Sequence, residues 1–151
     1  MRDFQRSKVY AAEFRLRDLY DIATRNDNPV VELDGITLTL PPEAKFGSIE
    51  SLQRYVDRVL PNVTVRAYRG ESHAIAYSLR REIAIPDYTN RWAMREIVVL
   101  HELAHIETDV SGHGPEFVTT FTDLLGRVMG PEAALAYRIL CDHAGVKFTV
   151  S

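Results

Sequence analysis

The sequence contains a single cysteine, Cys141, so no pair is present that could form an intrachain disulfide. It also lacks an apolar run long enough to span a bilayer, and its N-terminus is charged throughout instead of carrying the apolar core of a signal peptide. Long blocks of like charge are absent too, and the formal net charge is only -3. These absences give no strong indication of nucleic-acid or membrane binding, and we expect a cytoplasmic protein.

There is also no linker, low-complexity segment or internal repeat, and 151 residues suit one compact domain with a real core. Helical and strand-like patterns are mixed along the chain. We therefore expect residues 1–151 to form a single α+β domain, in which a small and mostly antiparallel sheet packs on helices.

Apolar periodicity and turn residues predict the elements of the first half of the chain. Helical spacing predicts helices from about Asp3 to Thr24 and from Ser48, a favourable N-cap, to just before Pro61. Alternation around Asp34-Gly35 predicts a β-hairpin. Further alternation predicts an antiparallel meander of three strands and a short strand at the end of the chain. These segments are Val63 to Arg69, His73 to Leu79, Glu82 to Pro86, and Val146 to Val150.

A long helical pattern runs from about Arg91 to Asp109 and is apolar at every position from Ile97 to Leu100. Apolar residues on nearly every side indicate a helix at the centre of the fold. Gly112 is suited to end this helix, and Pro115 and Pro131 are placed to begin two more. The first of these two helices carries the apolar residues Phe117, Phe121, Leu124, Leu125 and Val128, and the second carries Leu135, Ile139 and Leu140.

The central helix carries the run His101-Glu102-Leu103-Ala104-His105. Residues four apart share a helix face, so both imidazoles can reach one metal ion. From the next position, the carboxylate of Glu102 can take a proton from water that such an ion activates. Polar groups buried in so apolar a helix would cost about 1–3 kcal/mol each if unsatisfied, and a metal satisfies the imidazoles. The run predicts a Zn²⁺ site with Glu102 as its general base.

Two protein ligands are too few for a zinc site that keeps one position open, so a third must come from outside the helix. His113 is the best candidate, because it lies in a tight turn between two helices, where its side chain can point back at the metal. Three nearby carboxylates are less well placed or otherwise explained: Glu107, Asp109 and Glu116. Asp123 stays open, either as a rival ligand or as a partner that orients a ligand imidazole.

The His101 to His105 run, followed by His113-Gly114-Pro115-Glu116-Phe117, resembles the zincin metalloproteases. Its second half looks like the HGxxF element of the SprT and Spartan group. This resemblance implies zinc binding by His101, His105 and His113, with Glu102 as the catalytic base. One cysteine excludes the cysteine-rich ribbon that SprT-like proteins often add, and the spacing from His105 to His113 departs from the metzincin pattern. A second resemblance, to small actinobacterial metallohydrolases, rests on Arg2-Asp3, Gln5-Arg6, Val9-Tyr10 and Glu13.

These observations predict a zinc-dependent metallopeptidase with a zincin-like fold that cleaves a peptide or protein substrate. Two alternatives stay open: a non-catalytic module with a structural zinc ion, and a regulatory protease that acts only with a partner protein. By resemblance, either His73 to Leu79 or Glu82 to Pro86 would hold an extended peptide by strand addition. The group that stabilises the oxyanion could come from Tyr137, Arg138 or His143.

Overall fold

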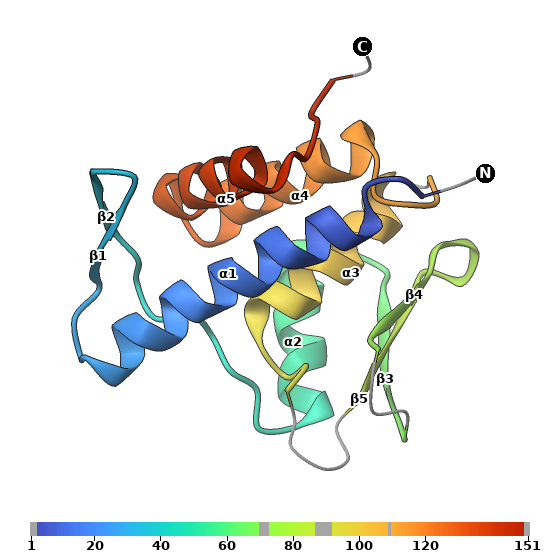
Figure 1. Ribbon diagram of the computed structural model, residues 1–151. Helices are drawn as coiled ribbons and strands as arrows, with labels where there is room; N and C mark the ends of the chain where they lie inside the picture. Colours follow the sequence, from blue (N-terminus) through green and yellow to red (C-terminus); the bar gives the residue numbers. More distant parts are fainter. Residues whose placement is uncertain (1–2, 70–72, 87–91, 109, 150–151) are drawn as a thin grey trace. The chain divides into compact units, whose positions relative to one another are not determined.

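The computed structural model describes residues 3–69, 73–86, 92–108 and 110–149. The chain divides into two compact units, Met1–Glu43 with Val110–Ser151 and, separately, Ala44–Asp109. Both units combine helices with a small sheet, so the protein is α+β, as the sequence predicts (Figure 1). That residues 1–151 act as a single domain stays a prediction. Among the described helices, none has the length and apolar character needed to cross a membrane.

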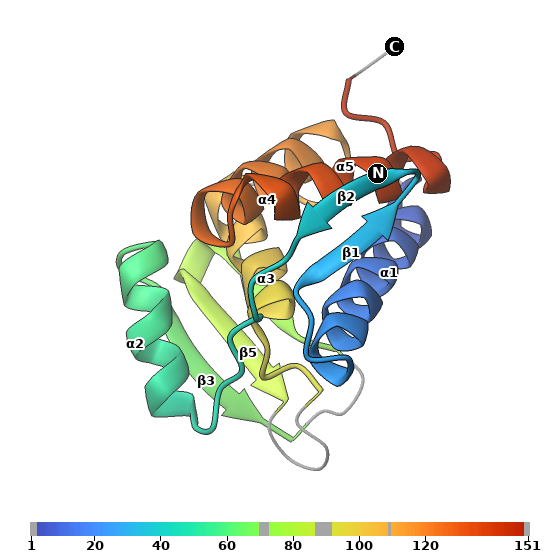
Figure 2. The same ribbon diagram turned by 90° about the vertical axis from the view of Figure 1, so that its left-hand side faces the viewer.

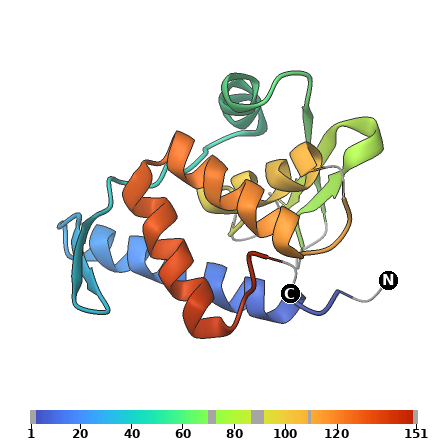
Figure 3. The ribbon, with the colours of Figure 1, turned by 90° about the horizontal axis from the view of Figure 1, so that it is seen from above.

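The first unit is built from α1 (Arg6–Arg25), the hairpin strands β1 (Val30–Leu33) and β2 (Ile36–Thr39), α4 (Pro115–Val128) and α5 (Pro131–Ala144). Helix α5 packs against both α1 and α4. The hairpin lies beside α1 and α5 (Figure 2). A sharp corner joins α4 to α5 (Figure 3), and Gly130 there has a φ of 109°, a conformation that side chains disfavour.

The predicted hairpin and both predicted proline-started helices are confirmed. Asp34 and Gly35 have φ values of 53° and 76°, the left-handed pair that a tight two-residue hairpin needs. Helices α4 and α5 each begin at their proline. Of the apolar residues that mark α5 in the sequence, Leu140 is buried, whereas Leu135 is 41% exposed. The buried face of the helix consists of Ala133, Ala136, Tyr137, Leu140 and Cys141.

The predicted terminal strand is wrong for the described residues, since 146–149 form no strand, and Val150 lies outside them. Gly145 adopts a left-handed φ of 80° at the C-cap of α5. The Val146 N–H then donates to the Cys141 carbonyl over 2.9 Å. This is the hydrogen bond of a Schellman cap, so the apolar residue that suggested a strand closes the helix instead.

Aromatic packing holds α4 against α5. Phe121 has no exposed surface, its ring lies 5.8 Å from the ring of Phe117, and it meets Tyr137 edge to face at 4.9 Å. Phe121→Ala is therefore expected to lower the free energy of unfolding by about 3–5 kcal/mol, measured by urea denaturation. Phe14→Ala is the control, because that ring is 58% exposed, and it should stay within about 0.5 kcal/mol of the unsubstituted chain. Equal losses in the two variants would contradict this packing.

The second unit contains α2 (Ile49–Val59), β3 (Thr64–Tyr68), β4 (Ile75–Tyr77), a 3-10 turn η1 (Ser78–Arg80), β5 (Glu82–Pro86) and α3 (Glu96–Thr108). The predicted N-cap of α2 is confirmed. The Ser48 hydroxyl accepts the Ser51 N–H over 3.0 Å, and the Ser51 hydroxyl accepts the Ser48 N–H over 3.3 Å. The two serines thus satisfy two backbone donors at the start of α2.

The three-stranded sheet has the order β3-β5-β4, with β5 parallel to β3 and antiparallel to β4. The predicted antiparallel meander is therefore wrong, although all three strands exist. Alternating polarity predicts a strand but not its neighbours. The buried run from Ile83 to Ile85 explains the observed order, because a strand buried at consecutive positions belongs in the middle of a sheet.

Candidate metal centre

Helix α3 is fixed at its first turn by a buried carboxylate. Glu96 is 7% exposed, its Oε1 accepts the Ala44 N–H over 3.1 Å, and its Oε2 accepts the Tyr55 hydroxyl. The Glu96 N–H in turn donates to the Ala44 carbonyl over 3.0 Å. A carboxylate in the first turn also interacts favourably with the positive end of the helix dipole. The helix begins at Glu96, later than the predicted Arg91, which lies outside the described residues.

Hydroxyl groups satisfy the carbonyls at the other end of α3. Thr108 donates to the Ala104 carbonyl over 3.0 Å, and Ser78, just after β4, donates to the His105 carbonyl over 3.1 Å. The His105 carbonyl is one of the last four of the helix, which have no backbone partner inside it. The second bond also ties the end of β4 to the turn of α3 that carries His105.

The predicted burial of α3 is confirmed. Residues from Ile97 to Leu100 are all buried, and His101 and Glu102 are only 1% and 5% exposed. His105 is half-buried. The rings of His101 and His105 lie 5.0 Å apart between centroids, at an interplanar angle of 66°. The four-residue spacing thus brings both imidazoles to one face of the helix, as predicted.

His113 lies in the predicted turn before α4. Gly112 has a φ of 87°, in the left-handed region that lets the chain reverse, and Gly114 is the N-cap of a helix that starts at Pro115. His113 is 6% exposed, which makes it a buried histidine and not the surface residue that a turn usually carries.

Four side chains of the same unit surround His113. Asp3 contacts it twice: Oδ1 accepts the His113 N–H over 3.1 Å, and Oδ2 lies 2.7 Å from the ring Nδ1. Gln5 donates to the His113 carbonyl over 2.9 Å. Tyr10 and Phe117 flank the imidazole, with ring centroids 5.2 Å and 4.9 Å away. Backbone, ring plane and ring rotation of His113 are thereby all constrained.

Burial would raise the pKa of Asp3, but hydrogen bonds and charge from His113, together with the charge of Arg6, outweigh it. The pKa therefore lies below its usual range, and the carboxylate is ionised at neutral pH. An ionised carboxylate only accepts hydrogen bonds, so the His113 Nδ1 must carry the proton between them. In the neutral form of the ring, Nε2 is then the nitrogen with a lone pair available for a metal.

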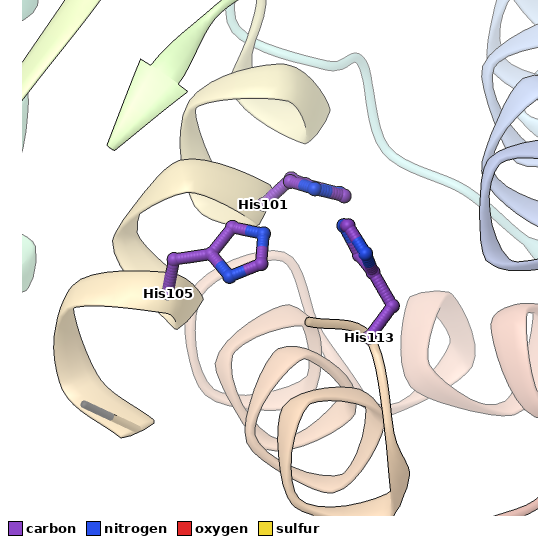
Figure 4. Close-up of side chains that lie close together, drawn as sticks. All are labelled: His101, His105 and His113. Carbon is purple, nitrogen blue, oxygen red and sulfur yellow. The ribbon is translucent and has the colours of Figure 1, made fainter. Parts of the chain in front are cut away.

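His101, His105 and His113 form a group that can hold a metal ion. One ligand atom from each residue can be chosen such that all lie within 4.8 Å of one another, and the three rings converge in Figure 4. Imidazole nitrogens bind zinc at about 2.0–2.1 Å, so two nitrogens of a tetrahedral site lie about 3.4 Å apart. The observed limit of 4.8 Å is larger than this spacing, so the three histidines form a candidate site and not a preformed tetrahedron. Three imidazole nitrogen donors suit a borderline-soft divalent cation better than a hard one.

The rival ligands that the structure describes do not join this group. Glu107, Glu116 and Asp123 are exposed, and Asp109 lies outside the described residues. Within the described ranges, no fourth histidine, cysteine or carboxylate completes the group. Cys141 is buried, and burial raises the pKa of its thiol to about 11. The thiol is therefore protonated at neutral pH, whereas the thiolate is the form that binds metals. Asp3 contacts the His113 ring, and the role of Asp123 as a partner of a ligand imidazole stays a prediction.

The three residues considered for oxyanion stabilisation have other contacts. Tyr137 has no exposed surface and packs against an aromatic ring of α4, and burial raises the pKa of its phenol. The guanidinium of Arg138 lies 4.4 Å from the Phe148 ring centroid. His143 Nε2 lies 2.6 Å from an Asp34 oxygen, and its Nδ1 lies 3.0 Å from an Arg15 nitrogen. Each is explained by packing or bonding inside the first unit.

Sequence patterns did not single out the carboxylate partner of His113. Asp3 precedes a helix and lies 110 positions from His113, so no local spacing links the two. The only signal is the second resemblance, since its residues include Asp3, Gln5 and Tyr10, and all three contact His113. Helix α1 begins at Arg6, later than the predicted Asp3, whose side chain is engaged with the turn.

Comparison with protein-family models, with curated proteins and with solved structures finds no match to this chain. The case for a function therefore depends on the histidine group and its surroundings.

Proposed function

We propose that this protein is a zinc-dependent metallohydrolase, and specifically a peptidase. His101, His105 and His113 would hold the ion, and Glu102 would act as the general base. The observation that carries this proposal is the group of three histidines whose ligand atoms lie within 4.8 Å of one another, directly beside a buried carboxylate in the sequence.

The number of donors favours a catalytic over a structural site. Structural zinc sites use four protein ligands, whereas catalytic sites use three and leave one position for water or substrate. In the part of the chain that is described, the group has three members. A purely structural zinc would need a further ligand, so this alternative is less well supported.

Zinc, when bound, acts as a Lewis acid that polarises the scissile carbonyl and lowers the pKa of water to about 7. Glu102 would take the proton from the attacking water and deliver it to the leaving amine. Its position next to His101 on a helix fixed at both ends holds the carboxylate in place for both transfers. Its 5% exposure limits competing contacts with bulk solvent.

Strand β4 is the best candidate for a peptide-binding edge. The predicted alternative, Glu82 to Pro86, is not suited to this role, because β5 is the central strand and both its edges are paired over Glu82 to Ala84. An edge strand offers free backbone groups to an extended peptide. β4 contacts α3, and Ser78 at its end donates to the His105 carbonyl. A peptide added to this edge would therefore run near the histidine helix.

Removal of the metal tests the proposal. We expect the zinc-loaded chain to cleave a mixed peptide library, monitored by mass spectrometry. Dialysis against 1,10-phenanthroline should reduce cleavage to background, and stoichiometric zinc should restore it, because the general base alone cannot activate water sufficiently. Unchanged cleavage by a chain from which metal analysis shows the zinc to be gone would contradict the proposal.

A further inference from the structure

The contacts of Asp3 with His113 go beyond those needed to hold a turn. One carboxylate oxygen accepts the backbone N–H of His113 over 3.1 Å, and the other lies 2.7 Å from Nδ1 of the same residue. A single side chain thus fixes the backbone and the ring together. Tyr10 and Phe117 flank the ring at 5.2 Å and 4.9 Å and restrict its plane.

We propose that Asp3 is a positioning residue that fixes the tautomer and rotation of His113, so that Nε2 is the atom presented to the metal. The inference rests on the zinc site proposed above, but not on the hydrolytic reaction. Ligand histidines commonly donate their other ring N–H to a carboxylate, which sets the tautomer and raises the basicity of the ligand nitrogen.

The double contact explains why a carboxylate is needed at this position. An asparagine has only one accepting oxygen. If that oxygen stays on the His113 N–H, the amide NH₂ faces Nδ1, and the ring proton must move to Nε2, the proposed ligand atom. If the amide is reversed, its NH₂ faces the backbone N–H, donor against donor. Neither orientation of asparagine reproduces both contacts of Asp3.

The other link to this turn is of a different kind. Gln5 donates to the His113 carbonyl over 2.9 Å and to the Lys147 carbonyl over 3.2 Å. These bonds hold the segment between α1 and the turn, but they do not involve the imidazole. Loss of Gln5 would therefore loosen the segment without changing which ring nitrogen carries the proton, which separates a structural role from control of the tautomer.

The test measures zinc affinity of the full-length chain by competition with a chromophoric chelator, with zinc alone as the added ligand. Asp3→Asn should bind zinc about 10–100-fold more weakly. Asp18→Asn, the same substitution at an exposed site of α1, should bind as tightly as the unsubstituted chain. Gln5→Ala should lose less affinity than Asp3→Asn, even if both lower the thermal stability equally.

A spectroscopic signature completes the test. In the zinc-loaded chain, proton NMR should show a downfield, slowly exchanging ring N–H of His113, retained in Gln5→Ala and lost in Asp3→Asn. Unaltered zinc affinity in Asp3→Asn, or an unaltered ring N–H signal, would overturn the inference and leave the hydrolase proposal standing. A chain that binds zinc through all three histidines but cleaves no peptide would overturn the hydrolase proposal and leave the inference about Asp3 standing. A chain that binds no zinc would overturn both.

Discussion

Zinc is expected to stay bound when Glu102 is replaced by glutamine, while peptide cleavage falls by roughly 100- to 10,000-fold. Glutamine keeps the size and shape of the side chain, so a helix that buries this position to 5% exposure can accept it. Its amide, however, cannot accept a proton from water. The proposed metal ligands are three other residues, so zinc occupancy should not depend on this carboxylate.

Glu107→Gln is the matched control for Glu102→Gln. It is the same substitution on the same helix, at an exposed position, and it should leave both zinc content and cleavage unchanged. The two variants are compared by metal analysis and by cleavage of the same peptide library. Full cleavage by Glu102→Gln would show that the residue is not the base, and loss of zinc would show that it is a ligand.

A scan of all five histidines is expected to divide them into two groups. Replacing His101, His105 or His113 with alanine should each abolish stable zinc binding, because two remaining imidazoles are too few for such a site. The loss should exceed the roughly 10–100-fold that removal of an outer hydrogen-bond partner causes. The chain supplies its own controls in His73 and His143, which lie outside the group.

The control variants also test whether a loss of zinc binding comes from loss of folding and not from loss of a ligand. His143→Ala breaks two side-chain contacts, with Asp34 and Arg15, so it perturbs structure yet should retain zinc. Chelator competition gives the affinity of each variant, and circular dichroism checks that it folds. Full zinc occupancy in His113→Ala would show that the third ligand is another residue and that Asp3 has no ligand to position.

The elements that the sequence predicts correctly depend on local chemistry. A serine cap, a two-residue turn and a proline at a helix start each act within a few residues, and Ser48, Asp34-Gly35, Pro115 and Pro131 all act as predicted. The histidine run is local in the same sense, because helix geometry alone sets the spacing of His101 and His105.

Features that join distant segments were predicted less well. Strand order depends on which strand is buried on both faces. The alternating pattern predicts an antiparallel meander, whereas β5 lies between β3 and β4 in the sheet. The partner of His113 comes from 110 positions away. Nothing in the spacing near His113 points to Asp3, so the tertiary structure is needed to identify this contact.

The metal content of the chain, purified without added zinc and measured by inductively coupled plasma mass spectrometry, tests the central claim most directly. The proposed site predicts about one zinc per chain, since three histidines are sufficient for a tight site with one open position. A chain that folds but carries no zinc, and gains none when zinc is supplied, would contradict the account.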